Sequence, residues 1–468
     1  MCGLSGILYK DEVFISHSQK LLSPRAINGE DTYISSSISL HHAHLSISDL
    51  NMDTRQPYED DAYIICFVGE IYNREYLVEA CGGKGGGNTE CQVLSQLFAT
   101  FGADGVAKIN GEFIICLFDK ATEITYLFRD RYGTKSLYYT FIDNVLAFSS
   151  EMKVLISEET AFSKQGLYDT LIFGYTISPH TLFENIWSIK PGTYLIHDKG
   201  DIVIKSYGKY VYTEDNGIID TIEQAVIRRI PKFQDTILFP LSGGADSNIT
   251  LYFLKKHFNG EIITYSFLSA INSEDVEYAS YNAVIHNCKH YIIPIDIHES
   301  TGQDIVHESI NNLINIGNVV RSNIAGIEQV KVEFSGDGRE ELFKANKHFN
   351  HSKIISNYNH IRKIYNSESY DITPKFLNHT MFDFNLQLLE KVTLTSGIER
   401  RLPFTDYELI RFSNHGDLYT LTVAKLLKDN SIRIVPSTYG HNNAVYFSYP
   451  DIENITKKII TLKKSLIL

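Results

Sequence analysis

The stretch Ile237-Leu-Phe-Pro-Leu-Ser-Gly-Gly-Ala-Asp-Ser247 decides the fold of the second half of the chain. An apolar run enters a glycine turn and an amphipathic run, residues 249–254, follows, so we expect a strand, a turn and a helix in that order. Successive backbone N–H groups in such a turn form an anion cradle at the start of a helix. The stretch therefore predicts a phosphate-binding loop, and simple packing of a glycine turn is the alternative.

The residues of this loop suit a nucleotide. Gly243 and Gly244 let the backbone approach phosphates. The hydroxyls of Ser242 and Ser247 can donate to phosphate oxygens, and Asp246 can hold Mg²⁺. Because no Gly-Lys-Ser/Thr sequence follows, the loop is not of the Walker type.

We expect one sheet around this loop and a second, different sheet in the part of the chain that precedes it. Apolar runs at residues 236–241, 262–267 and 291–295 alternate with helical patterns, which predicts an α/β fold with a parallel sheet, and the chain after residue 305 is predicted to be mainly helical. Upstream, short apolar runs at 64–67, 113–118, 126–128 and 145–148 predict an antiparallel sheet, with a helix after Asn88. A chain of 468 residues exceeds one ordinary core, and we place the boundary between domains 1–210 and 211–468.

Composition excludes several classes of protein. The formal net charge of -13 argues against a nucleic-acid partner, which needs clustered basic residues. No apolar run reaches the roughly 20 residues that cross a bilayer, so we expect a cytoplasmic protein without a membrane partner. The six cysteines show no CxxC or Cys/His ligand spacing, so the sequence indicates neither zinc nor a disulfide framework, and Cys66 and Cys116 are predicted to lie in the core.

Cys2 differs from the other cysteines by its position. Removal of the initiator methionine would leave a thiol and a free α-amine on one residue. That amine, with an ordinary pKa of about 7.7–8.0, can take the thiol proton and later return it to a leaving group. On position alone, an incidental cysteine is the better interpretation.

The order of several segments changes that interpretation. Residues 2–7, Cys-Gly-Leu-Ser-Gly-Ile, resemble the start of class II glutamine amidotransferases, whose N-terminal cysteine attacks the side-chain amide of glutamine. Further segments resemble the same family in the same order, namely residues 45–49, 56–57, 69–73, 88–90, 111–113, 129–133 and 150–153. The resemblance implies an Ntn-type layered α+β domain in which Cys2 is catalytic, Gly69 offers its N–H to the oxyanion and Glu70 holds the ammonium of glutamine.

Three positions depart from the amidotransferase pattern. His44 stands where an arginine grips the glutamine carboxylate, and Asn88 stands where an aspartate lies beside the amine. Asn88 is equally suited to cap the following helix. Val68 replaces the asparagine that supplies the second oxyanion donor, a loss that typically costs about 10²–10³ in turnover.

The second half resembles the ATP-pyrophosphatase domain of the asparagine synthetase family. The resemblance assigns ATP binding to the loop and to three further residues, and Mg²⁺ to Asp246 and Glu340. It makes Asp337 and Glu399 catalytic, although Asp337 and Glu340 exchange the side-chain lengths usual at their two positions. The further ATP-binding residues are Ser266, Ser335 and Gly336.

Three functions remain open from the sequence. In the first, glutamine supplies ammonia, ATP adenylates a carboxylate, and an amide forms with release of AMP and pyrophosphate. In the second, the N-terminal domain is a degenerate scaffold and the ATP domain forms an amide, lactam or peptide ring. The third is a non-catalytic nucleotide-binding protein. ATP, glutamine, Mg²⁺ and a carboxylate are the implied ligands, a homodimer is one option for assembly, and residues 433–443 lack the phosphate-binding lysine usual in the family.

Overall fold

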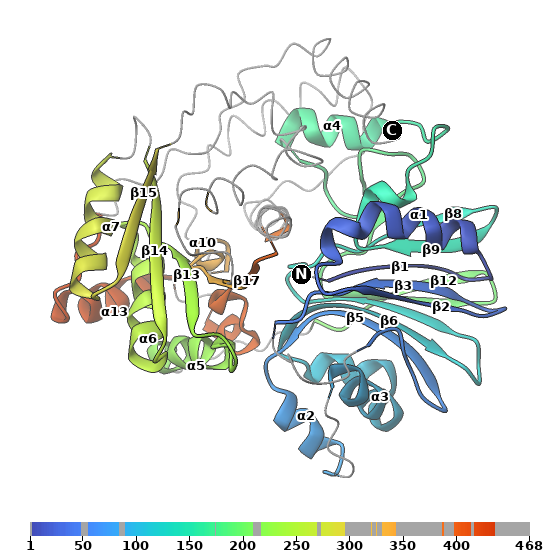
Figure 1. Cartoon of the computed structure of the whole chain (residues 1–468), viewed down its shortest axis with the longest axis horizontal. Coiled ribbons are helices and arrows are strands. Elements are labelled where there is room, and N and C mark those ends of the chain that lie inside the picture. The colour runs from blue at the N-terminus through green and yellow to red at the C-terminus, as the bar shows by residue number, and fades with distance from the viewer. Residues whose placement is uncertain are drawn as a thin grey trace.

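The computed structural model describes twelve parts of the chain, which together form two α/β halves (Figure 1). The first half contains antiparallel sheets and the second a parallel sheet, as the sequence predicts. No helix among these parts is long and apolar enough to span a membrane. The described parts are residues 2–47, 55–83, 89–173, 175–208, 217–268, 273–294, 320, 324, 330–342, 386–387, 397–412 and 416–435.

Two six-stranded antiparallel sheets make the first half. The first has the order β10-β8-β9-β1-β3-β2 and the second β12-β11-β7-β6-β5-β4. The first-sheet strands are β1 (Gly3–Ile7), β2 (Glu30–Ile34), β3 (Ser39–Ala43), β8 (Tyr138–Ile142), β9 (Val145–Ser149) and β10 (Trp187–Ser188). The second-sheet strands are β4 (Tyr58–Glu59), β5 (Tyr63–Ile71), β6 (Gly111–Asp119), β7 (Thr125–Arg129), β11 (Thr193–Asp198) and β12 (Asp201–Ser206).

The alternation of side chains along these strands builds the layers. Leu4 and Leu40 of the first sheet share a buried core with Cys66 and Cys116 of the second, so the two sheets pack face to face. Cys66 and Cys116 lie opposite each other across β5 and β6, and both are fully buried and unoxidised. The prediction that both are core residues is confirmed. The outer faces carry the helices α1 (Glu12–Leu22) and α4 (Lys164–Phe173) beside the first sheet, and α2 (Arg74–Ala80) and α3 (Glu90–Phe101) beside the second (Figure 1).

The start of α3 corrects one interpretation of the sequence. Thr89 is the N-cap residue: its side chain accepts from the N–H of Gln92, whose own side chain accepts from the N–H of Thr89. This capping box satisfies two donors that a helix start leaves unpaired. The suggestion that Asn88 caps the helix was therefore wrong, and Asn88 itself lies outside the described residues.

A five-stranded parallel sheet organises the second half in the order β15-β14-β13-β16-β17. Its strands are β13 (Thr236–Pro240), β14 (Glu261–Leu268), β15 (Lys289–Pro294), β16 (Val332–Phe334) and β17 (Glu399–Arg401). The last two strands were missed because three residues are too few for a periodicity, and they add sheet to a segment predicted to be mainly helical. The helices are α5 (Ile218–Arg229), α6 (Ala245–His257), α7 (Ser273–Ile285), α10 (Arg339–Leu342) and α13 (Gly416–Asp429), with short 3₁₀ turns η6 (Pro403–Thr405) and η7 (Tyr407–Phe412).

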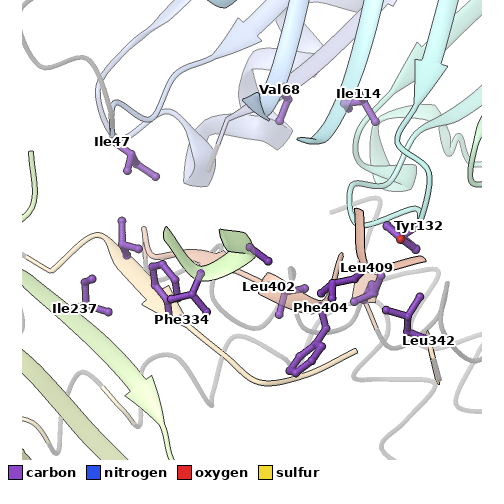
Figure 2. Packing of buried hydrophobic residues seen from close by; sticks show 14 of the residues in the cluster. Ile47, Val68, Ile114, Tyr132, Ile237, Phe334, Leu342, Leu402, Phe404 and Leu409 are labelled. Atoms are coloured by element: carbon purple, nitrogen blue, oxygen red, sulfur yellow. The ribbon is translucent and has the colours of Figure 1, made fainter. Parts of the chain in front are cut away.

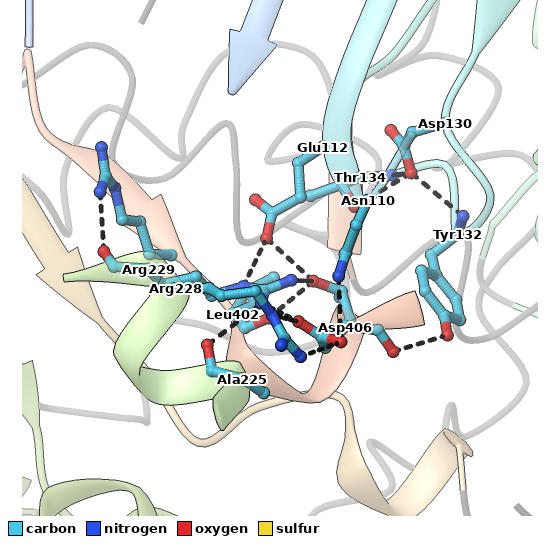
Figure 3. Close-up of polar contacts among 12 residues, drawn as sticks. Asn110, Glu112, Asp130, Tyr132, Thr134, Ala225, Arg228, Arg229, Leu402 and Asp406 are labelled. Atoms are coloured by element: carbon cyan, nitrogen blue, oxygen red, sulfur yellow. Dashed lines mark hydrogen bonds and ion pairs between the residues drawn. The ribbon is translucent and has the colours of Figure 1, made fainter. Parts of the chain in front are cut away.

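A junction of apolar and charged side chains joins the halves. One buried cluster includes Val68 and Ile114 from the first half and Leu402 and Phe404 from the second (Figure 2). Beside it lies the fully buried carboxylate of Asp406 (Figure 3).

Asp406 binds side chains from both halves across this junction. Its Oδ2 lies 2.7 Å from Nη1 of Arg229, and its Oδ1 lies 2.9 Å from Nη2 of Arg228. Asn110 of the first half donates its side-chain N–H to Oδ1 over 3.1 Å. Glu112 accepts from the hydroxyl of Thr405 over 2.8 Å, so both halves supply partners to one buried network. Burial raises the pKa of Asp406, but Arg229 and Arg228 outweigh it and hold that pKa below its ordinary value.

Candidate active centres

The first centre is built around Cys2, which directly precedes β1. The Leu45 N–H donates to the Cys2 sulfur over 3.2 Å, and the thiol donates back to the Leu45 carbonyl over 3.4 Å. Arg25 donates to the Cys2 carbonyl over 3.0 Å and so fixes the backbone. Burial raises the pKa of the Cys2 thiol, and the nearby carboxylates Glu399 and Glu70 raise it further. The resting thiol is therefore protonated near neutral pH and needs a base before it can attack.

The structure describes the surroundings of two of the three predicted glutamine-binding residues, His44 and Glu70. His44 follows β3, and burial lowers its pKa, so its ring is neutral at pH 7 and is a weaker anchor for a carboxylate than arginine. Glu70 at the end of β5 lies 3.4 Å from Nη2 of Arg401, which comes from the other half. Asn88 is outside the described residues.

Gly69 and Val68 sit at adjacent positions of β5. Gly69 has φ +135°, and a Cβ there would lie 1.9 Å from the Glu112 carbonyl oxygen, so only glycine fits. The side chain of Val68 is 1% exposed and belongs to the core between the sheets. A hydrocarbon therefore fills the position at which the family resemblance places an amide donor.

A third residue near Cys2 was not singled out from the sequence. His42 on β3 brings one ring nitrogen to within 4.8 Å of ligand atoms of Cys2 and His44. His42 and His44 are two residues apart and therefore face the same side of the strand. That alternation was the available signal, but only the pairing of β1 with β3 brings both histidines to the cysteine.

The second centre is the loop between β13 and α6. Gly243 N–H donates to Oδ1 of Asp275 over 2.9 Å, and Gly244 N–H donates to the Ser242 hydroxyl over 3.1 Å. The Ser242 and Ser247 hydroxyls lie 2.8 Å apart. The predicted strand, turn and helix are present, and the groups that suit phosphate are bonded within the protein.

Asp246, the predicted Mg²⁺ ligand, also has protein partners. Its Oδ1 accepts from Nε of Arg339 over 2.7 Å and from the Tyr419 hydroxyl over 2.7 Å. Burial and the Asp246 charge raise the pKa of Tyr419 well above its ordinary value, so this phenol stays protonated as a donor. Glu340 lies in α10, but its side chain is outside the described structure.

The remaining predicted ATP residues approach the loop from neighbouring strands. A Cβ on Gly336 would lie 2.6 Å from the Ser247 nitrogen, so the segment after β16 packs on the first turn of α6. Ser335 donates its hydroxyl to Asp337, whose Oδ2 lies 3.6 Å from Nη1 of Arg400. Ser266 on β14 donates to the Leu241 carbonyl over 2.5 Å.

Glu399 lies at the junction of the two centres. Its Oε1 accepts from Nε of Arg401 over 3.1 Å, and the same guanidinium contacts Glu70. Glu399 is 4% exposed and lies close enough to Cys2 to raise the pKa of the thiol. Arg401 thus links the two halves between Cys2 and β17 through its ion pairs with Glu70 and Glu399.

Comparisons with known proteins cover nearly the whole chain. Residues 1–208 match the family described as glutamine amidotransferase domain, and residues 217–381 match the family described as asparagine synthase. The glutamine-hydrolysing asparagine synthetase 1 of Bacillus subtilis is 25% identical over 99% of this chain and 77% of its own length. A putative asparagine synthetase of Methanocaldococcus jannaschii is 25% identical over 88% of this chain and 80% of its own.

A relative with a different name matches a smaller part. The amidase chry2 of Gibberella zeae is 30% identical over 45% of this chain and 34% of its own length. The two matched families follow one another in the order in which the two centres occur. The chain therefore belongs to the asparagine synthetase family.

Proposed function

We propose that the chain is an ATP-dependent synthetase that transfers ammonia from glutamine to a carboxylate and releases AMP and pyrophosphate. The observation that carries the proposal is the pairing of an N-terminal thiol centre at Cys2 with the loop at 242–247 in one chain of this family. We assign glutamine hydrolysis to residues 1–210 and amide formation to residues 211–468.

In the first half-reaction Cys2 is the nucleophile. With Met1 removed, the α-amine of Cys2 takes the thiol proton, and the thiolate attacks the side-chain amide carbon of glutamine. The proton returns to nitrogen, the C–N bond breaks, and ammonia leaves a thioester that water hydrolyses to glutamate. The N–H of Gly69 is the proposed oxyanion donor, and Glu70 holds the substrate ammonium.

In the second half-reaction a carboxylate oxygen attacks the α-phosphorus of ATP and pyrophosphate leaves. Ammonia then attacks the acyl-adenylate carbon, and AMP leaves as the amide forms. The loop N–H groups and the hydroxyls of Ser242 and Ser247 hold the phosphates after releasing their internal partners. The Gly243 N–H, which already donates to the carboxylate of Asp275, supports the proposal because it shows that this loop binds an anion. We place Ser266, Ser335 and Gly336 around the nucleotide, with Asp337 and Glu399 beside the acyl group.

The site fits Mg²⁺ through its oxygen ligands. Both described bonds to the Asp246 carboxylate use Oδ1, which leaves Oδ2 for a hard cation together with Glu340. Bound Mg²⁺ would neutralise the charge that develops on pyrophosphate. Arg339 and Tyr419 meanwhile fix the orientation of the carboxylate.

A second function is favoured by the substitutions around Cys2. With Val68 in the hydrocarbon core and a neutral His44, glutamine turnover is expected to be slow, and an amine other than ammonia can then serve as the nucleophile. The N-terminal half would act as a scaffold, and the product would be a substituted amide or a lactam.

The test measures the two half-reactions separately in the full chain. Protein is incubated with ATP, Mg²⁺, glutamine and a panel of carboxylates, and glutamate, pyrophosphate and amide products are measured by mass spectrometry. Glutamate release coupled to carboxylate-dependent pyrophosphate release is the expected result. Pyrophosphate release that needs an organic amine and yields no glutamate supports the second function, and no pyrophosphate with any substrate rejects both.

A further inference from the structure

The three side chains around the thiol form a group that the glutamine reaction does not explain. Cys2, His42 and His44 each offer one ligand atom, and these atoms lie within 4.8 Å of one another. The pairing of β1 with β3 sets Leu4 opposite His42, and the same register continued by two residues sets Cys2 opposite His44. All three side chains therefore converge on the face of the first sheet that is turned toward β5.

One ring nitrogen of each histidine in this group lacks a partner among the described residues. Nε2 of His42 and Nδ1 of His44 are buried and make no hydrogen bond among the described residues. His42 is 1% exposed and donates to the backbone carbonyl of Phe67, which by elimination occupies Nδ1 and leaves the lone pair on Nε2. A buried, unpaired acceptor held in one tautomer is the usual arrangement of a metal-ligating histidine.

We propose that Cys2, His42 and His44 form a binding site for Zn²⁺. Zn²⁺ prefers sulfur and imidazole ligands in tetrahedral geometry, and the group contains one thiol and two imidazoles. The α-amine of Cys2, once Met1 is removed, is the fourth ligand and closes a five-membered chelate with the sulfur. Mg²⁺ and Ca²⁺ are disfavoured here because the group offers no oxygen ligand.

Binding changes the state of the nucleophile. The thiol loses its proton to solvent as the Zn–S bond forms, and the sulfur lone pair that would attack glutamine is then engaged by the metal. The amine that serves as the base is engaged as well. Zn²⁺ and glutamine therefore exclude each other, a consequence that rests on the proposed function, whereas the site itself rests on the ligand geometry.

Co²⁺ replaces Zn²⁺ in the test because its absorption reports the ligands. The full chain is freed of metal with a chelator and titrated with Co²⁺, then with Zn²⁺ as the competitor. We expect one equivalent to give a thiolate-to-cobalt charge-transfer band and the visible bands of tetrahedral Co²⁺, both abolished by Zn²⁺ or by Cys2→Ala. His42→Gln and His44→Gln should each weaken Zn²⁺ binding at least about 10–100-fold, the cost of losing even an outer-shell partner.

His41→Gln is the matched control. His41 lies on the same strand but faces the other way and contacts Glu30, so its substitution should leave metal affinity within about twofold. Circular dichroism checks that each variant is folded. No charge-transfer band in the wild type, or unchanged affinity in folded His42→Gln, overturns the proposal. A wild type that binds added Zn²⁺ but releases no glutamate when assayed free of metal removes the glutaminase assignment and leaves the zinc site in place.

Discussion

The two centres of this molecule differ in whether their polar groups already have hydrogen-bond partners within the protein. Around Cys2, buried nitrogens of His42 and His44 have no partner among the described residues. In the loop at 242–247, the Gly243 N–H and the Asp246 carboxylate are already engaged, by Asp275 and by Arg339. A ligand of the first centre would supply the missing partners of the histidine nitrogens. A ligand of the second centre must displace the internal hydrogen bonds of the loop.

The difference has an energetic consequence. A buried polar atom without a partner costs about 1–3 kcal/mol, and a ligand that supplies the partner recovers that cost. Replacing one hydrogen bond with another yields much less, because a typical bond contributes only about 0.5–1.5 kcal/mol net. We therefore expect tight occupation of the thiol centre and a phosphate loop whose affinity depends on Mg²⁺ and on the rest of the nucleotide.

Substitution of Cys2 by Ala should give the largest effect. Glutamine-dependent glutamate release is expected to fall at least about 10⁴-fold, because the nucleophile is lost. Product formation with added ammonium salt should be unchanged within about twofold, since the loop at 242–247 is intact. Coupled glutamate and pyrophosphate assays make the comparison. Equal glutamine-dependent rates in the two proteins would show that another group hydrolyses glutamine.

The junction between the centres is tested by Asp406→Asn. Removing this charge breaks the shorter of the two ion pairs of the buried Arg229 and leaves only Glu112, 3.6 Å from its Nε. Breaking a buried pair costs about 3–5 kcal/mol of unfolding free energy. Urea unfolding followed by fluorescence measures the change, with the exposed Asp429→Asn as the control.

The same carboxylate predicts a pH dependence. Its folded-state pKa is held below the ordinary value, so the stability it contributes is present above about pH 4 and is lost as the pH falls through the folded pKa. In Asp406→Asn this acid-dependent loss should shrink. An unchanged acid profile in the variant would mean that other carboxylates govern acid unfolding.

Asp246→Asn tests the proposed role of this carboxylate as a Mg²⁺ ligand. Carboxylate-dependent pyrophosphate release should fall about 10²–10³-fold, because charge on the departing pyrophosphate is no longer compensated. Glutamate release at Cys2 should persist. The Asp429→Asn protein is again the control. Unchanged pyrophosphate release in Asp246→Asn would show that the glycine turn serves only packing and does not bind phosphate.

Asp275→Asn should give the smallest effect and the opposite sign. The substitution weakens the internal anion that occupies the Gly243 N–H, so ATP should bind about 3–10-fold more tightly, the equivalent of one hydrogen bond. Isothermal titration with ATP and Mg²⁺ measures the affinity. Weaker binding would show that Asp275 holds the loop in its binding shape instead of competing with phosphate.

Sequence reasoning succeeded where local pattern decides structure. The apolar run at 236–241 and the glycine turn after it specify strand, loop and helix, and the buried positions of Cys66 and Cys116 follow from their apolar neighbours. The roles of Cys2, Gly69 and the ATP residues stay predictions.

The contacts that sequence reasoning missed depend on residues far apart in the chain. His42 meets Cys2 only because β1 pairs with β3 in one register, and Arg339 meets Asp246 only because α10 lies against the start of α6. No local periodicity encodes either contact. The Cys/His spacing considered in the sequence runs along the chain, whereas Cys2, His42 and His44 come together across strands.

The network around Asp406 limits which domains can be exchanged between this protein and its relatives. Asn110 and Glu112 come from one half, while Arg229 and Thr405 come from the other, and all four are buried. A gene fusion that exchanged one half for that of a distant relative would leave charges facing unmatched partners. A chimaera is therefore expected to fold well only when both sides of the network are transplanted together.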